Sequence, residues 1–330
     1  MNSEPNKNAL NRREFLTRSA GAGISVAAAC AAGLWFHDSR GPASSIATLS
    51  DTGLPDFSMG DLNPKMAIVR GSDRRTALNS ALKALGGIES FVKKNDRVLL
   101  KVNAAFASPP MLSATTHPDV VSEMSRLCLQ AGAASVAVTD NPINDPNSCF
   151  ALSGISEAAR RAGATLILPD PDAFRPLSVP NARLIRSWPV LLKPFKNVTR
   201  VFGLAPVKDH HRSGASLSMK NWYGLLGGRR NIFHQDINTI IAELALMVRP
   251  TLVILDGTTS MMTNGPTGGS LSDLKQTNTM IVSTDQVAAD AFGATLLEKS
   301  PSALPYIGKA EAAGVGRADY RALKPIELSL

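Results

Sequence analysis

The chain has 330 residues, with 35 Lys and Arg against 27 Asp and Glu and a formal net charge of +8 at pH 7. No basic run with interleaved aromatic residues occurs, so the sequence gives no indication of nucleic-acid binding despite the positive charge. The length is ample for a large hydrophobic core. Three cysteines are too few for a disulfide-rich scaffold.

The first segment has the layout of an export signal. After a polar start, the Arg12-Arg13 pair is followed by Glu, Phe and Leu, and the chain is then apolar and uncharged from Ala20 to Phe36. This arrangement resembles a twin-arginine signal peptide. We therefore expect residues 1–43 to be a signal peptide and linker, the twin-arginine translocase to be the export partner, and the destination to be the periplasm. An uncleaved signal would be the one segment that contacts the membrane.

Residues 44–330 are predicted to form a single α/β domain with its core at about 66–300. Residues 118–131 have apolar positions at the i, i+3, i+4, i+7 spacing of a helix with one buried face. Nearly continuous apolar runs at 97–103, 135–140, 165–170 and 251–257 are typical of strands that are buried on both faces. Alternation of such strands with helices predicts a mostly parallel sheet with helices on both faces.

Each of these strands ends in polar residues. The set comprises Lys101, Asn103, Asp140, Asp170 and Asp256. Ligands of open parallel sheets bind beyond the carboxyl ends of the strands, so we expect these side chains to lie on one rim. The alternative is that each Asp begins a turn or caps a helix.

Two further segments complete the expected domain. Several prolines within residues 171–215 predict an inserted region of short strands or loops, which could also serve as a docking surface for a partner. A strand at 279–283 precedes Asp285 and another helix, and the tail beyond Pro301 is predicted to contain one short helix and an irregular end.

Polar residues are densest between Lys208 and His234. This segment contains Lys208, His210, His211, Lys220, Asn221, Arg229, Arg230 and His234. In one interpretation the cations bind a phosphate or carboxylate, assisted by glycine amides. In a second, His210 and His234 join Asp140 or Asp256 as metal ligands. In a third, the segment is a solvated basic surface.

The loop that contains Gly268 is a further candidate for contact with a ligand, although an ordinary turn would explain it equally well. Several catalytic and nucleotide-binding motifs do not occur in the sequence: the P-loop, Gly-x-Gly-x-x-Gly after a strand, Gly-x-Ser-x-Gly, His-Glu-x-x-His and Cys-x-x-Cys. The sequence therefore does not support the commonest nucleotide-binding, hydrolase, zinc-protease or redox functions.

Several short motifs together resemble the DUF362 family, a domain of unknown function. They include Leu100-Lys101-Val102-Asn103, Thr115-Thr116-His117-Pro118, Lys208-Asp209-His210, Ser218-Met219-Lys220-Asn221, Asp256-Gly257 and Thr284-Asp285. The resemblance implies no activity. Some members carry ferredoxin-like cysteines, but an iron–sulfur cluster needs four thiolates, and only Cys128 and Cys149 follow the signal. The resemblance nominates one site made of Lys101, Asn103, Lys208, His210, Lys220, Asn221, His234, Asp256 and Asp285.

The working hypothesis is a periplasmic protein that binds a small anionic molecule or a cofactor of unknown identity. Lys101, Lys220 and Asn221 would hold the anion, and His210 or His234 would transfer protons if the protein is an enzyme. The alternative is a non-catalytic ligand-binding or redox-accessory protein.

Overall fold

The computed structural model describes residues 12–35, 53–60 and 65–330. The chain divides into two compact units, Met1–Ser50 and Asp51–Leu330. The first unit contains the helix α1 (Arg12–Trp35). Among the described residues, no helix is both long and apolar enough to cross a membrane. The predicted boundary near residue 43 lies outside the described residues.

Within residues 65–330, nine strands form one sheet in the order β11-β1-β10-β9-β7-β2-β3-β4, with β8 paired to β7. The strands are β1 (Met66–Arg70), β2 (Arg97–Lys101), β3 (Ser135–Thr139), β4 (Thr165–Ile167), β7 (Arg200–His210), β8 (Gly214–Ser216), β9 (Leu252–Met261), β10 (Leu274–Ser283) and β11 (Ile326–Ser329). β10 runs antiparallel to both neighbours and β8 runs antiparallel to β7, whereas all other pairs are parallel. The predicted, mostly parallel sheet is confirmed.

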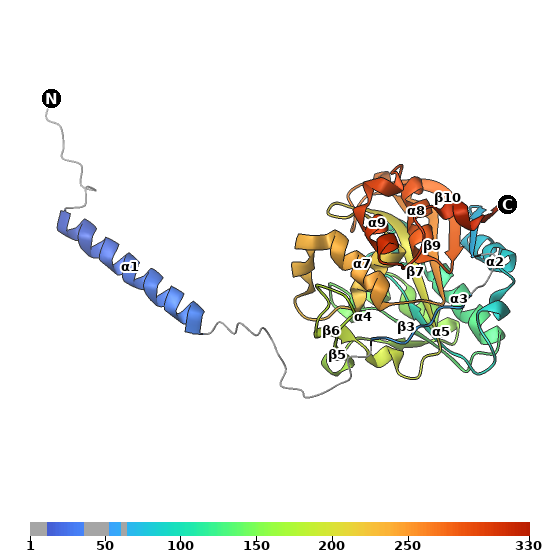
Figure 1. Ribbon diagram of the computed structural model, residues 1–330, viewed down its shortest axis with the longest axis horizontal. Helices are drawn as coiled ribbons and strands as arrows, with labels where there is room; N and C mark the ends of the chain where they lie inside the picture. Colours follow the sequence, from blue (N-terminus) through green and yellow to red (C-terminus); the bar gives the residue numbers. More distant parts are fainter. Residues whose placement is uncertain (1–11, 36–52, 61–64) are drawn as a thin grey trace, which may run out of the picture. The chain divides into compact units, whose positions relative to one another are not determined.

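Helices cover both faces of this sheet (Figure 1). Because side chains alternate along a strand, Val98 and Leu100 face one hydrophobic core and Leu99 faces the other. The first core includes residues of α2 (Arg74–Ala84), α3 (Pro118–Gln130), α4 (Pro146–Leu152) and α5 (Ile155–Arg161). The second includes residues of α6 (Ser218–Asn221), α7 (Ile237–Met247), α8 (Gln286–Leu296) and α9 (Pro305–Ala312).

The proline-rich insert is shorter than the sequence predicts. Its two strands, β5 (Phe174–Leu177) and β6 (Trp188–Leu191), pair only with each other. The remainder of the expected insert contains β7, which lies between β2 and β9 in the middle of the main sheet. The sequence does not predict this strand because it contains Pro206, and proline has no N–H group to donate to a neighbouring strand. The strand accommodates it where the register with β9 shifts, between Pro206 and Lys208.

The C-terminal tail is also more regular than predicted. After α9, the chain returns as β11 and pairs in parallel with β1 at the edge of the sheet. Within the described chain, both cysteines of the second unit are free and buried. Burial raises the pKa of the Cys128 thiol, which makes it an inert core residue.

Candidate functional site

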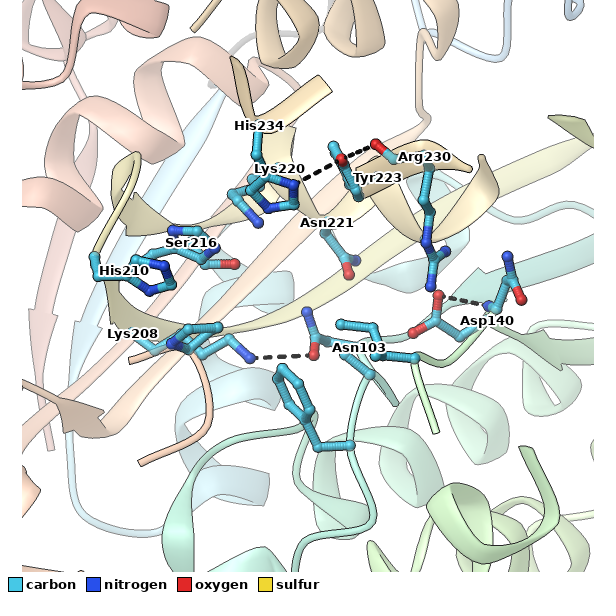
Figure 2. Close-up of a pocket in the computed structure, with 17 residues that line it drawn as sticks. Asn103, Asp140, Lys208, His210, Ser216, Lys220, Asn221, Tyr223, Arg230 and His234 are labelled. Carbon is cyan, nitrogen blue, oxygen red and sulfur yellow. Dashed lines mark hydrogen bonds between the residues drawn. The ribbon is translucent and has the colours of Figure 1, made fainter. Parts of the chain in front are cut away.

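A cavity of about 230 Å³ lies beyond the carboxyl ends of β2, β3 and β7 (Figure 2). Its walls are formed by Asn103, Ala105, Phe106, Asp140, Asn141, Ile143, Lys208, His210, His211, Ser216, Lys220, Asn221, Tyr223, Gly224, Arg230, His234 and Pro266. Seven of the predicted site residues are in this set. The polar ends of the parallel strands therefore do meet the histidine-containing segment.

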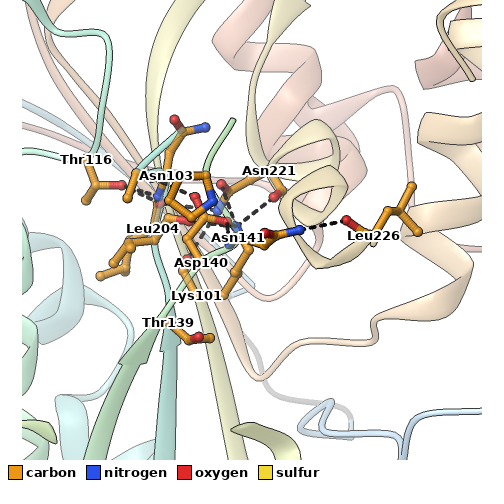
Figure 3. Close-up of polar contacts among 12 residues, drawn as sticks. Lys101, Asn103, Thr116, Thr139, Asp140, Asn141, Leu204, Asn221 and Leu226 are labelled. Atoms are coloured by element: carbon orange, nitrogen blue, oxygen red, sulfur yellow. Dashed lines mark hydrogen bonds and ion pairs between the residues drawn. The ribbon is translucent and has the colours of Figure 1, made fainter. Parts of the chain in front are cut away.

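A buried ion pair forms the base of the site (Figure 3). Nζ of Lys101, on β2, lies 2.7 Å from Oδ1 of Asp140, which follows β3, and neither side chain is more than 2% exposed. Lys101 Nζ also donates to the carbonyl oxygen of Asn221, at 2.8 Å. Burial lowers the pKa of Lys101, and the Asp140 carboxylate opposes this effect. Gly224 is required beside the pair, since a Cβ there would lie 2.0 Å from Asp140 Oδ1.

The short helix α6 is fixed in position by buried polar contacts. The amide of Asn221 donates to the carbonyl oxygens of Lys101 and Leu204, both at 3.2 Å. At the other end of α6, the backbone N–H groups of Ser218 and Met219 donate to the carboxylate of Asp290 on α8. These contacts hold α6 against β2, β7 and α8, which sets the position of Lys220 at the cavity.

Two further lysines line the cavity and differ in their contacts. Lys208 Nζ donates to the carbonyl oxygen of Ala114 and lies 3.4 Å from Oδ1 of Asn103. Lys220 Nζ has no hydrogen-bond or ion-pair partner among the residues that the structure describes, and it lies 5.2 Å from the centre of the Tyr223 ring. Burial lowers the pKa of Lys208 to about 7, and the charge of Lys220 contributes to this shift. Burial also lowers the pKa of Lys220 to about 7, with a contribution from the charge of Arg230.

Three imidazoles are stacked along one wall of the cavity. The ring centres of His210 and His211 are 5.1 Å apart, those of His210 and His234 are 6.0 Å apart, and the rings are nearly parallel. Nδ1 of His234 lies 3.1 Å from the carbonyl oxygen of Asn231, and Nδ1 of His211 lies 3.3 Å from that of Gly265. Since a carbonyl only accepts, Nδ1 carries a hydrogen in both rings, and the neutral form of each ring has its lone pair on Nε2.

His210 has the opposite arrangement. Its Nδ1 accepts from the backbone N–H groups of Arg212 and Ser213, at 3.2 and 3.3 Å, so the neutral ring carries its hydrogen on Nε2. Burial lowers the pKa of His210 to about 2, with a further contribution from Lys220. The ring therefore stays neutral at physiological pH. This geometry favours a hydrogen-bond donor over the proton carrier that the sequence predicts at this position.

Tyr223 and Arg230 join the histidine wall to the base of the cavity. The Tyr223 hydroxyl donates to the carbonyl oxygen of Arg230 and lies 3.2 Å from Nδ1 of His234 (Figure 2). The Arg230 guanidinium donates to the carbonyl oxygens of Leu226 and Pro142. Burial lowers the pKa of Arg230, which the Asp140 carboxylate opposes, and raises the pKa of Tyr223 to about 12, so the phenol stays neutral.

Three predicted site residues lie elsewhere. Asp256 is in the middle of β9 and pairs with Arg74 of α2, at 2.7 Å, on the opposite face of the sheet from Lys101. Asp285 caps the N-terminus of α8. It lies away from the cavity because β10 is antiparallel, so this strand finishes where the parallel strands begin. Gly268 lies in a turn in which its N–H donates to Asn264, and its neighbour Pro266 contributes to the cavity instead.

The predicted His/Asp metal site does not form. In the part of the chain that the structure describes, no three His, Cys, Asp or Glu side chains are placed to hold a metal ion. Asp140 faces Lys101 instead of the histidines. The site prediction omits several cavity residues. Two of them are close in sequence to predicted residues: Asn141 follows Asp140, and Tyr223 is two residues after Asn221. Phe106 belongs to a long loop, and no pattern in the sequence indicates it.

A second cavity, of about 460 Å³, adjoins the first. The two share the residues Asn141, Ile143, Tyr223, Arg230 and His234. The second cavity adds Phe174 of β5, together with Pro142, Gly227, Gly228 and Asn231. The proline-rich insert therefore contributes a wall to the cleft next to the cation-lined cavity.

The fold and this cavity define an α/β protein with a cation-lined cavity at the carboxyl ends of its parallel strands. The chain belongs to the family described as "Domain of unknown function (DUF362)", which matches residues 98–295. It is 24% identical over 254 residues to the thylakoid-associated protein sll1697 of Synechocystis sp., covering 72% of this chain and 74% of that protein.

The chain also has a distant structural similarity to the lactate racemase apoprotein of Thermoanaerobacterium thermosaccharolyticum. The TM-score is 0.38 and the sequence identity is 11%, over 74% of this chain and 58% of that one.

Proposed function

We propose that the domain binds a small anionic molecule in the 230 Å³ cavity. One observation carries this proposal: Lys208, Lys220 and Arg230 all line the cavity, and its one carboxylate, that of Asp140, is already paired with Lys101. Cations that are gathered in a buried space without a counter-charge are costly unless a ligand compensates them. A carboxylate or phosphate would supply that charge and form charge-assisted hydrogen bonds.

The size of the cleft supports a ligand with two parts. The first cavity has room for a carboxylate or phosphate group with a few attached atoms, and the adjoining 460 Å³ cavity can take a larger, less charged portion. In this arrangement Tyr223, Arg230 and His234 contact the ligand where its two parts meet, because these residues line both cavities.

The histidines take separate roles in this proposal. His210 presents an Nε2–H group and stays neutral, so it donates a hydrogen bond to the ligand without changing charge. His234 keeps the lone pair of Nε2 and lies at the junction of the two cavities. If the bound molecule is transformed, His234 is therefore the better candidate for the acid or base.

Calorimetric titration with sulfate and with oxalate tests anion binding, because both keep a constant charge between pH 6 and pH 9. We expect Lys220→Met to weaken binding about tenfold or more, as loss of a charge-assisted hydrogen bond does. Lys193→Met removes an exposed lysine of the insert and serves as the control. Unchanged affinity in Lys220→Met, or no binding of either anion by the unmodified protein, would contradict the proposal.

The affinity should also depend on pH. Because the pKa values of Lys208 and Lys220 in the free protein are about 7, binding above pH 7 requires proton uptake. We expect the dissociation constant to rise by about tenfold per pH unit for each lysine that must be protonated. A dissociation constant that is flat from pH 6 to pH 9 would show that neither lysine contributes its charge.

We also propose that residues 1–43 direct export through the twin-arginine pathway to the periplasm. The support is the Arg12-Arg13 pair followed by an uncharged stretch, which lies in α1. A reporter fused after Ser50 should be exported, and replacing both arginines by lysine should keep it in the cytoplasm. Sequencing the N-terminus of the exported protein would distinguish a cleaved signal from a retained anchor.

A further inference from the structure

Lys220 differs from the other two lysines of the site. Lys101 is held by Asp140 and by the Asn221 carbonyl, and Lys208 is held by the Ala114 carbonyl. Lys220, by contrast, borders the cavity without a hydrogen-bond or ion-pair partner in residues 65–330. A primary amine in this position is free to react with whatever occupies the cavity.

The surroundings of Lys220 favour its neutral form. The side chain is only 9% exposed, and the carboxylate of Asp140 in the cavity wall is paired with Lys101. Burial, together with the nearby Arg230 guanidinium, lowers the pKa of Lys220 to about 7, so a large fraction of the amine is unprotonated at neutral pH. Desolvation and a neighbouring cation are the two means by which proteins make a lysine nucleophilic.

The same cavity contains groups suited to a carbonyl compound that carries an anionic group. Arg230 and Lys208 can hold a carboxylate, since both are cations that line the cavity. The Nε2–H group of His210 can donate to an oxygen on which negative charge develops, because its Nδ1 accepts from the backbone and the ring stays neutral. The site thus offers an amine, an anion clamp and a neutral hydrogen-bond donor.

We propose that Lys220 forms a Schiff base with a small carbonyl compound bearing a carboxylate, of the 2-oxo acid class. This inference rests on the proposed anion site. The Nζ lone pair attacks the carbonyl carbon, and the carbonyl π electrons move to the oxygen. Proton transfer from nitrogen to that oxygen gives a carbinolamine. Loss of the hydroxyl group with the second nitrogen proton releases one water and leaves the C=N bond, with no oxidant or reductant required.

Reductive trapping tests this step on the full chain. The protein is incubated with pyruvate or glyoxylate and sodium cyanoborohydride, which converts an imine into a stable secondary amine, and the modified residue is located by peptide mass spectrometry. We expect one adduct per chain, on Lys220. At oxo acid concentrations that saturate the site at every pH, the initial rate of adduct formation should rise about tenfold between pH 6 and pH 8, following the unprotonated fraction of an amine whose pKa is about 7.

Two variants make the result specific. Lys220→Arg keeps the positive charge but cannot form the imine, so the adduct should be lost while the thermal unfolding midpoint shows that the domain is folded. Lys193→Arg changes an exposed lysine and should leave the adduct on Lys220 unchanged. An adduct that persists in Lys220→Arg, or adducts spread over exposed lysines, would overturn the proposal.

The outcome is separable from that of the proposed function. If sulfate binds to the unmodified protein but neither oxo acid is trapped, the Schiff base is wrong and the anion site stands. If sulfate and oxalate do not bind, the anion site itself is wrong. Trapping on Lys220 that oxalate suppresses would support both, because the two ligands would compete for one cavity.

Discussion

The ends of β3 and β4 show how similar local sequences can lead to different environments. Each strand follows an Ala-Gly-Ala segment, is apolar, and is followed by an aspartate, Asp140 or Asp170. Asp140 is 2% exposed and pairs with the buried Lys101, whereas the Asp170 side chain is 43% exposed and pairs with Lys193, itself 55% exposed. The difference arises because β3 lies between β2 and β4, while β4 is at the edge of the sheet.

This contrast teaches that the position of a strand in the sheet decides what a terminal aspartate does. Beyond β3, the segment from Lys208 to His234 covers the strand end, so the buried ion pair lies at the base of a cavity. Beyond β4 the aspartate side chain accepts from Lys193 of the insert, and its carbonyl oxygen accepts from the N–H group of Ala173. A shared motif therefore identifies a strand end, but it does not identify a site.

The largest effect is expected from breaking the buried pair. Asp140→Asn leaves Lys101 buried without a counter-charge, which should lower the free energy of unfolding by about 3–5 kcal/mol in urea denaturation. Adding Lys101→Met to this variant removes the buried, unpaired charge and should restore part of the lost free energy of unfolding. A double variant as unstable as Asp140→Asn alone would show that the pair matters through shape and not through charge.

A smaller effect of opposite sign is expected at Lys220. Lys220→Met replaces an uncompensated buried cation with an apolar side chain of similar length, so the ligand-free protein should become more stable by about 1–4 kcal/mol at pH 6. Between about pH 7 and pH 10.5, unfolded wild-type protein binds more protons than folded wild-type protein, because Lys220 has the lower pKa when folded. The free energy of unfolding of the wild type therefore rises with pH over that range.

The advantage of Lys220→Met should therefore shrink as the pH rises from about 7 to about 10.5, which thermal unfolding at several pH values would measure. A constant advantage over this range would indicate that the gain comes from packing alone.

The smallest effect is expected at the exposed Asp170–Lys193 pair. Asp170→Asn removes the exposed pair with Lys193 and should leave the urea midpoint unchanged within measurement error, because solvent screens such pairs. It also serves as the matched control for Asp140→Asn, since the same substitution is made at the end of the neighbouring strand. A destabilisation comparable to that at Asp140 would contradict the view that burial distinguishes the two ends.

Local sequence patterns were sufficient for the main elements and for much of the site. The apolar runs at β2, β3, β4 and β9, the spacing in α3 and the polar strand ends are local features, and each can be recognised in the sequence alone. Their combination placed Lys101, Asn103 and Asp140 at one edge, because parallel strands end on the same side. The density of cations and histidines from Lys208 to His234 added the second wall.

Tertiary structure decided what a local pattern cannot contain. The direction of β10 removed Asp285 from the site, and the alternation of side chains along β9 turned Asp256 towards Arg74. The central place of β7 was hidden by Pro206. The direction of a strand, its place in the sheet and the face to which its side chains point all depend on pairings between residues far apart in the chain. These pairings place Lys220, without a partner among the described residues, in a cavity lined by other cations.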